Sequence, residues 1–213
     1  MTIELWGGFL LVVLILNITP GPDMAYILSR AIAQGAPAGI VSAAGVSVGA
    51  LFHVVFATII FALAAQLPDF AFALLLAAGA SYLIWLGVSS LREKAEAIVV
   101  VPMSDRKAMT RIFLDGVVID ILNPKVALFF LALLPGFMPA NNSSPAIWFL
   151  GLGVLVVVFS FMIEAVLVMA SQKMRTIFAK STKGQIVLHR IMGVVFIALG
   201  LFAFTAVDFG AMI

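Results

Sequence analysis

The stretch from Asn17 to Asp23, which reads Asn-Ile-Thr-Pro-Gly-Pro-Asp, interrupts a long hydrophobic segment. Pro20 and Pro22 lack a backbone N–H and clash with the preceding helical turn, and Gly21 between them tolerates almost any backbone angle. The sequence therefore predicts a helix that breaks here and restarts at an acid, Asp23. In a lipid bilayer such a break is tolerated only where protein buries it or where it lines a water-filled cavity.

The composition of the chain indicates whether water or lipid surrounds this segment. Of its 213 residues, 64% are hydrophobic and 10% are charged, and the mean hydropathy is +1.23. A soluble domain carries about 25% charged residues, so this chain lacks the polar side chains that would cover its surface in water. The sequence therefore predicts an integral membrane protein. With no cysteine and no metal-ligand spacing around its two histidines, the chain is expected to hold no metal and no cofactor.

Hydrophobic runs predict six membrane-spanning helices, because each run supplies the ~20 apolar residues that a span requires. These runs cover residues 3–28, 38–65, 70–91, 112–138, 147–170 and 186–206. The connections between them are short and leave no room for a soluble domain. We therefore expect a single transmembrane domain over residues 1–213, with a first repeat at about 1–91, a cytoplasmic loop at 92–111 and a second repeat at about 112–213.

The basic residues predict how this domain is oriented. Of the 12 Lys and Arg residues, all except Lys125 fall in the connections that a six-span chain places on one side. The positive-inside rule makes that side cytoplasmic, so both termini are expected to face outward. Asp115 is expected near the cytoplasmic interface, in contact with solvent.

A second break occurs in the fourth predicted span, where Asn123, Pro124 and Lys125 interrupt an apolar run. Three spans separate the two breaks, so the two halves of the chain would have opposite orientations. Proline-interrupted segments at corresponding positions are typical of inverted-repeat transporters, which bind cargo near the bilayer midplane. The expected fold is therefore all-α, with six helices in two inverted three-helix repeats and with helices one and four broken at Pro20, Pro22 and Pro124. The alternative is that these prolines only kink the helices for packing.

The two breaks carry groups that suit a zwitterion such as an amino acid. The N-terminus of a half-helix presents free N–H groups and about +0.5 of a charge, which suits a carboxylate. Unwound carbonyls and an acid suit an ammonium group or a proton. The candidates for binding a substrate are Asp23, Asn123, Lys125, Asp120, Asn17 and Gly21.

Ionisable side chains within the spans are candidates for proton coupling, because each costs ~2.5–3.5 kcal/mol near the middle of a span. The candidates are Asp23, Glu164 and His53. Each has a structural alternative. Asp23 could cap a helix, and Glu164 could be a buried partner of Lys125 or Arg111. For His53, a hydrogen bond to a neighbouring helix is the favoured interpretation.

At these residues the sequence resembles the lysine exporter and homoserine/threonine exporter family (LysE/RhtB) of bacterial amino-acid efflux proteins. The resemblance rests on the run from Thr19 to Asp23, and on the run from Asn123 to Ala132 with Pro135 and Phe137. It implies export of amino acids from cytoplasm to exterior, driven by the proton motive force. It also implies a location in the bacterial inner membrane, so the termini that the basic residues place on the outer side are expected in the periplasm.

The sequence departs from the family pattern at Asp120, where many relatives have a neutral residue such as Asn, and at Gly136, where Gln is frequent. An extra acid near the break would favour a cationic group or alter the coupling to protons. The expected partners are a small amino-acid substrate, protons and the lipid bilayer, with a homo-oligomer possible. No enzyme activity and no nucleic-acid partner is expected. A six-helix channel and a non-transporting assembly protein are the alternatives. A membrane redox carrier is disfavoured because there is no cysteine.

Overall fold

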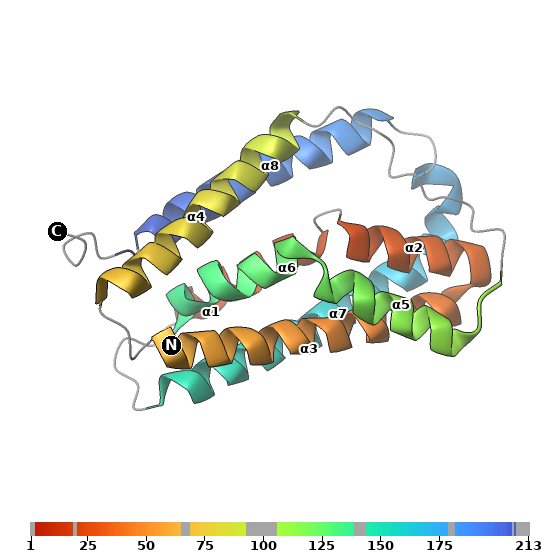
Figure 1. Cartoon of the computed structure of the whole chain (residues 1–213). Coiled ribbons are helices and arrows are strands. Elements are labelled where there is room, and N and C mark those ends of the chain that lie inside the picture. The colour runs from red at the N-terminus through yellow and green to blue at the C-terminus, as the bar shows by residue number, and fades with distance from the viewer. Residues whose placement is uncertain are drawn as a thin grey trace.

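The computed structural model describes residues 3–18, 21–64, 69–92, 106–138, 144–178, 182–205 and 207. All regular structure within these ranges is helical (Figure 1). The elements are α1 (Ile3–Ile18), α2 (Pro22–Gln34), α3 (Ala36–Ala64), α4 (Asp69–Arg92), α5 (Met109–Ile121), α6 (Pro124–Leu128), the π-helix η1 (Phe129–Leu133), the 3-10 helix η2 (Leu134–Phe137), α7 (Pro145–Phe178) and α8 (Thr182–Phe204).

The described residues contain between two and four candidate membrane spans. Ala36–Leu63 in α3 and Pro145–Ser171 in α7 are each long and apolar enough to cross a bilayer. Two bent pairs can each cross as one broken span: Leu5–Ile18 with Pro22–Gln34, bent by 59°, and Met109–Ile121 with Pro124–Phe137, bent by 51°. The predicted breaks in the first and fourth spans are therefore confirmed, while the total of six spans and the two inverted repeats stay predictions.

Two of the helices are longer than the hydrophobic runs that predicted them. We expected the first span to end at 28, but α2 continues to Gln34, and α7 continues to Phe178 rather than 170. The hydrophobic run stops at polar Ser29 and Arg30, yet the structure buries both inside the protein. Arg30, which we counted in a cytoplasmic connection, lies within α2 and is fully buried. Hydropathy alone cannot separate a buried polar residue from the end of a span.

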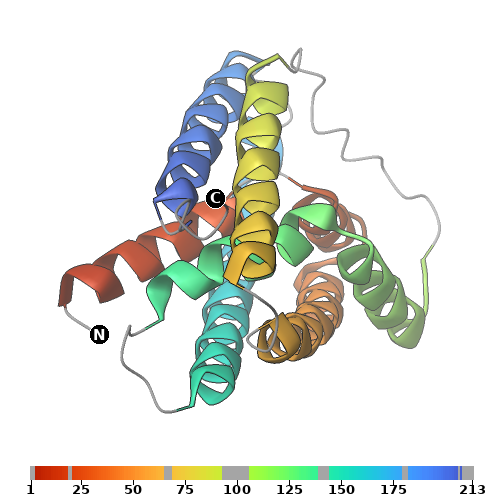
Figure 2. The same ribbon diagram turned by 60° about the vertical axis from the view of Figure 1, so that its left-hand side comes forward.

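The helices form two groups with the broken segments between them. Both views show α4 and α8 lying side by side (Figures 1 and 2). On the other side of the molecule, α3 packs against α2, α5 and α7. In Figure 1, α1 and α6 lie between these two groups. The two breaks are thus held in the middle of the molecule.

The contact between α4 and α8 brings the two backbones together. A Cβ on Gly87 would lie 2.6 Å from the carbonyl oxygen of Gly193, and a Cβ on Gly193 would lie 2.7 Å from the carbonyl oxygen of Gly87. Small residues of this kind let helices approach closely in a membrane, where packing and not water drives association. On its other side α4 meets η1, where Gly79 faces Ala132.

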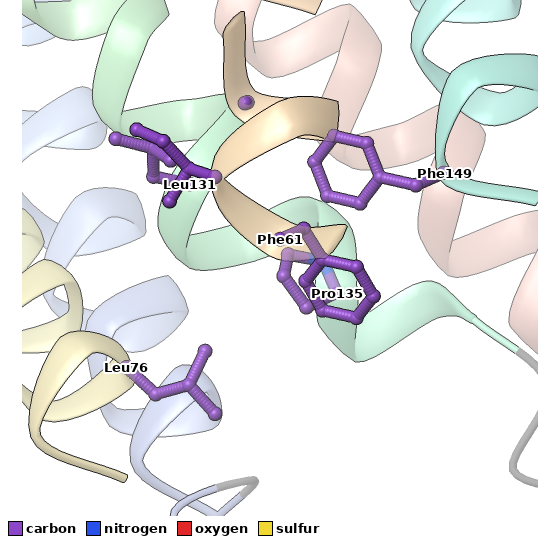
Figure 3. A pocket seen from close by; sticks show the side chains of 7 residues that line it. Phe61, Leu76, Leu131, Pro135 and Phe149 are labelled. Carbon is purple, nitrogen blue, oxygen red and sulfur yellow. The ribbon is translucent and has the colours of Figure 1, made fainter. Parts of the chain in front are cut away.

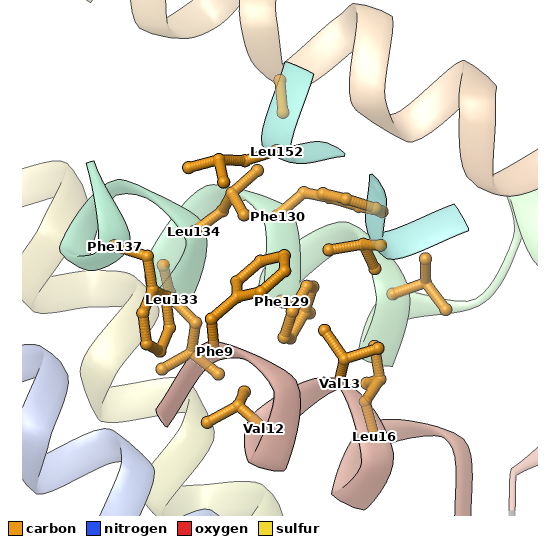
Figure 4. Close-up of a cluster of buried hydrophobic side chains, with 14 of the residues drawn as sticks. Phe9, Val12, Val13, Leu16, Phe129, Phe130, Leu133, Leu134, Phe137 and Leu152 are labelled. Carbon is orange, nitrogen blue, oxygen red and sulfur yellow. The ribbon is translucent and has the colours of Figure 1, made fainter. Parts of the chain in front are cut away.

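A hydrophobic core joins α1 to the second broken segment (Figure 4). The rings of Phe9 and Phe137 meet edge to face with centroids 5.7 Å apart, and the buried Phe129 and Phe130 come from η1. The N–H of Leu134 bonds to the carbonyl of Phe129, five residues earlier, which is the wider π-helical spacing. This core fixes α1 beside η1, and it therefore fixes the two breaks relative to each other.

The outer surface of α3 is apolar, as a lipid-facing surface requires. Phe52, Val55, Phe56 and Ile59 are each more than 50% exposed. Their spacing places them on one stripe of the helix, because residues three and four apart share a face. A stripe of four large apolar side chains, each about half exposed, would be unusual on a water-soluble monomer. The stripe therefore supports the prediction of an integral membrane protein.

Candidate functional site

The two breaks meet in a buried ion pair. The Lys125 Nζ lies 3.0 Å from Oδ2 and 3.2 Å from Oδ1 of Asp23. The two side chains are 9% and 11% exposed, respectively. The ion pair connects residues that are 102 positions apart in the chain. Two residues selected only because each follows a proline in an apolar run are therefore direct partners.

The first break is shaped to hold this pair close to the backbone. Gly21 is the N-cap of α2, with an extended backbone (φ −150°, ψ 175°), and Pro22 opens the helix. Proline suits this position because the N–H that it lacks would have no partner within the helix. Asp23 follows in the first turn, where a negative charge is favoured. A Cβ on Gly21 would collide with Oδ1 of Asp23 and lie 2.8 Å from Nζ of Lys125. The ion pair therefore fills the space that a side chain at Gly21 would need.

The second break repeats this order of parts with a different cap. Asn123 is the N-cap of α6, its side-chain oxygen accepts a hydrogen bond from the N–H of Lys125 at 3.1 Å, and Pro124 opens the helix. The N–H of Asn123 donates to the carbonyl of Asp120 at 2.8 Å, which closes the turn from α5. Lys125 places a positive charge at the positive end of a helix, which is unfavourable. Asp23 supplies the opposite charge that offsets it.

A small polar cavity lies beside the ion pair. Its volume is about 30 Å³, which gives room for about two water molecules and is too small for an amino acid. We refer to this arrangement, in which the cavity has no room for an amino acid, as the closed form. The polar residues that line the cavity come from α1, α2, α3, α5 and α7, and they are Asn17, Asp23, Ser47, Asp120, Ser160 and Glu164.

Two further acids line this cavity, and each has one carboxylate oxygen without a hydrogen-bond partner among the described residues. Asp120 and Glu164 are 1% and 7% exposed. Within the described part of the chain, Oδ2 of Asp120 and Oε2 of Glu164 have no hydrogen-bond partner, and neither has Oγ of Ser47. The ion pairs described for Lys125 and Arg111 are with Asp23 and Asp115.

Asn17 and His53 make hydrogen bonds within the protein. Nδ2 of Asn17 donates to the carbonyl of Val13 at 2.7 Å and to Oγ of Ser160 at 2.8 Å. Nε2 of His53 lies 2.8 Å from the carbonyl oxygen of Asp120 and donates to it. The favoured interpretation of His53, a bond from α3 to a neighbouring helix, is confirmed. Asn17 lines the cavity with its amide hydrogens already used by α1 and α7.

The side-chain amide of Asn123 has a donor to spare. Asn123 is 2% exposed, and its Nδ2 has no hydrogen-bond partner among the described residues. Its oxygen is used as the cap of α6, so the amide is held in a fixed orientation. An oriented, unused N–H donor next to Lys125 is suited to a carboxylate.

Sequence reasoning missed three polar residues at or near the site. Ser47 and Ser160 are single hydroxyls in apolar helices, and nothing in their local sequence separates them from serines that bond back to their own helix. Arg30 donates from Nη1 to Oε1 of Gln34 at 3.0 Å, and its guanidinium lies 5.6 Å from the ring centroid of Tyr26. Only the packing of the helices identifies these groups.

A polar network closes the end of α2 against the start of α5. The side-chain amide of Gln34 bonds to both the N–H and the carbonyl of Lys107, at 3.0 Å each. Asp115 is 2.6 Å from Nζ of Lys107 and 2.9 Å from Nε of Arg111. We expected Asp115 to be solvated, but its side chain is only 17% exposed. Its carboxylate is held by two cations, which explains why it can be largely buried.

A second cavity, of about 10 Å³, lies among α3, α4, α7 and η1 (Figure 3). Its lining is apolar and consists of Ala57, Ile60, Phe61, Leu76, Leu131, Pro135 and Phe149. An apolar space of this size stays dry. No group of three or more metal-binding side chains that could hold an ion is found in the described ranges.

Comparison with known proteins gives one family. The sequence profile of the family described as LysE type translocator matches residues 14–206. A homoserine/homoserine lactone efflux protein of Salmonella typhimurium is 28% identical over 94% of this chain and 96% of that protein. A leucine efflux protein of Klebsiella pneumoniae is 26% identical over 84% and 85%. A threonine efflux protein of Escherichia coli is 25% identical over 66% and 68%. No solved structure matches the chain significantly.

Proposed function

The chain belongs to the LysE type translocator family, and we propose that it is a secondary active exporter that moves amino acids or close derivatives out of the cytoplasm in exchange for protons. The relatives are efflux transporters and not enzymes, and this chain is likewise a transporter. The relatives named above are efflux proteins for homoserine and its lactone, for leucine and for threonine. The observation that carries the proposal for this chain is the buried pair of Asp23 and Lys125 at the meeting point of the two breaks.

The chain forms one domain of six spans in the bacterial inner membrane, with both termini in the periplasm. The two halves are inverted repeats, at about 1–91 and 112–213, joined by the loop at 92–111. The repeated order of cap, proline and ionisable residue at the two breaks supports this arrangement. The one-sided distribution of basic residues supports the orientation.

The ion pair is exchanged for the charges of the cargo. A zwitterion carries an ammonium and a carboxylate, so it can replace each member of the pair without leaving a buried charge unpaired. Asp23 receives the ammonium group. Lys125 and the free Nδ2 of Asn123, at the N-terminus of α6, receive the carboxylate. The cavity must widen for this exchange, because in the closed form it holds only about two waters.

Counterflow in proteoliposomes tests this function. Vesicles loaded with unlabelled homoserine, leucine, threonine or lysine are diluted into the same labelled amino acid at equal pH on both sides. We expect exchange of at least one of them by the wild type, and a loss of about tenfold or more for Asp23→Asn and Lys125→Ala. Asp115→Asn removes an acid from the peripheral network and is the matched control. Wild-type exchange rates in both site variants would show that the pair is only a structural link.

A further inference from the structure

We infer that Asp120 and Glu164 form the proton-carrying pair of the transport cycle, while Asp23 serves as the partner of Lys125. This inference rests on the proposed function and assigns its proton coupling to named groups. Both acids line the same small cavity, from α5 and α7, and each directs a carboxylate oxygen without a partner into buried space. At 1% and 7% exposure, neither carboxylate can be solvated well by bulk water.

The charges around the cavity do not balance unless protons are counted. Three carboxyl groups, those of Asp23, Asp120 and Glu164, surround a space next to one ammonium group, that of Lys125. The ammonium group is within 3.2 Å of both oxygens of Asp23. If the other two acids were ionised, they would be buried charges without a paired cation, which is strongly unfavourable. In the closed form each therefore carries a proton.

The neighbours of the pair reinforce this assignment. The charged groups that act on Asp120 are Asp23 from α2 and Lys125 from α6, which have opposite signs, and Glu164 is acted on by these two and by Asp120. From α3, His53 faces the backbone carbonyl of Asp120 and not its carboxyl group. The remaining polar side chains of the lining, on α1, α3 and α7, are uncharged and are Asn17, Ser47 and Ser160.

Asp23 is poorly suited to carry the proton in the closed form. Protonating it would break its ion pair with the buried ammonium group of Lys125. Protonating Asp120 or Glu164 removes an unfavourable charge instead. When these acids release their protons to the cytoplasm the cavity becomes negative and takes up water, which solvates the two carboxylates, and the ammonium group of the cargo is then attracted to Asp23. Protons from the outer side then return to Asp120 and Glu164, which removes the negative charge that attracted the ammonium group and lets Asp23 pair with Lys125 again.

The first test separates coupling from exchange. Proteoliposomes carrying wild type, Asp120→Asn, Glu164→Gln or the Asp115→Asn control are assayed with labelled homoserine, leucine and threonine, both by counterflow at equal pH and under a pH gradient. We expect gradient-driven accumulation to fall at least about tenfold more than counterflow in the two cavity variants. Equal losses in both assays, or gradient-driven accumulation as in wild type, would overturn the inference. Failure of wild-type protein to exchange any amino acid would instead refute the proposed function.

The second test does not depend on cargo. Infrared difference spectroscopy of the purified protein at neutral pH detects protonated carboxyl groups by their C=O stretch. The wild type should show this band, each cavity variant should lose part of it, and the double variant Asp120→Asn/Glu164→Gln should lack it. The band should persist in Asp115→Asn. Absence of protonated carboxyl groups from the wild type at neutral pH would overturn the inference, whatever the transport assays give.

Discussion

The break before α2 and the break before α6 share their order of parts, but they differ in how well the charge suits the helix. Asp23 is an acid at the positive end of a helix of 13 residues, a placement worth about 0.3–1 kcal/mol. Lys125 is a base at the same end of a helix of five residues, where the dipole opposes it. The second break thus has the charge that suits its helix less well, although Asn123 caps it with a side-chain hydrogen bond. It depends on the first for its counter-charge, which joins the two halves of the chain at their centre.

The largest expected effect comes from removing one member of the pair. Breaking a buried ion pair costs about 3–5 kcal/mol. Asp23→Ala should lower the unfolding free energy more than Lys125→Ala does, by up to about 1 kcal/mol. In Asp23→Ala, the remaining Lys125 is opposed by the dipole of α6. In Lys125→Ala, the remaining Asp23 is favoured by the dipole of α2. Denaturant unfolding of the purified protein in detergent measures both. The double variant should recover much of the loss, and equal losses in the two single variants would contradict the role given to the helix dipoles.

A methyl group at Gly21 should disturb function more than stability. In Gly21→Ala the new Cβ would overlap Oδ1 of Asp23 and approach Nζ of Lys125. The end of the lysine can shift, so the fold should survive with the pair displaced. We expect exchange to fall about tenfold or more with a smaller loss of stability than Asp23→Ala causes. Gly151→Ala, where nothing lies within 4 Å of the added methyl, is the matched control and should behave as wild type.

Removing the side-chain cap of α6 should lower stability moderately. The cap of α2, Gly21, has no side chain that could be removed in the same way. Asn123→Ala deletes the acceptor for the N–H of Lys125, which should cost about 1 kcal/mol in unfolding free energy. Asn123→Ser keeps an acceptor and should restore most of this stability. It lacks the spare amide donor, so its affinity for cargo should remain weakened in a binding assay. Full recovery of both stability and affinity in Asn123→Ser would remove Asn123 from the carboxylate site.

The smallest loss of stability should come from breaking the ion pairs of Asp115 with Lys107 and Arg111. These partly exposed pairs are the reference against which the buried pair of Asp23 and Lys125 is compared. The side chains of Lys107 and Arg111 are 34% and 69% exposed, so their bonds to Asp115 are partly screened by solvent. Partly exposed pairs are worth about 0–1 kcal/mol. Asp115→Asn should change the unfolding free energy by no more than about this amount. A loss as large as that of Lys125→Ala would mean that burial is not what distinguishes the two sites.

The two breaks could be found from the sequence because their signals are local. A proline ends a helix wherever it occurs, and an ionisable residue beside it in an apolar run is conspicuous, as with Asp23 and Lys125. The groups around the cavity could not all be found this way. Ser47 and Ser160 become part of the site only because α3 and α7 face the breaks. The sequence predicts a connection at Arg30, because hydropathy cannot show that its guanidinium is buried in contact with Tyr26 and Gln34.

The backbone contact between α4 and α8 has a mechanical consequence. With Gly87 and Gly193 face to face, the backbones of α4 and α8 are in close contact, and we expect the two helices to move together as one lever. The lever rests on η1, where Gly79 meets Ala132. Because η1 continues directly from α6, a tilt of the lever is transmitted along one short stretch of chain to Lys125.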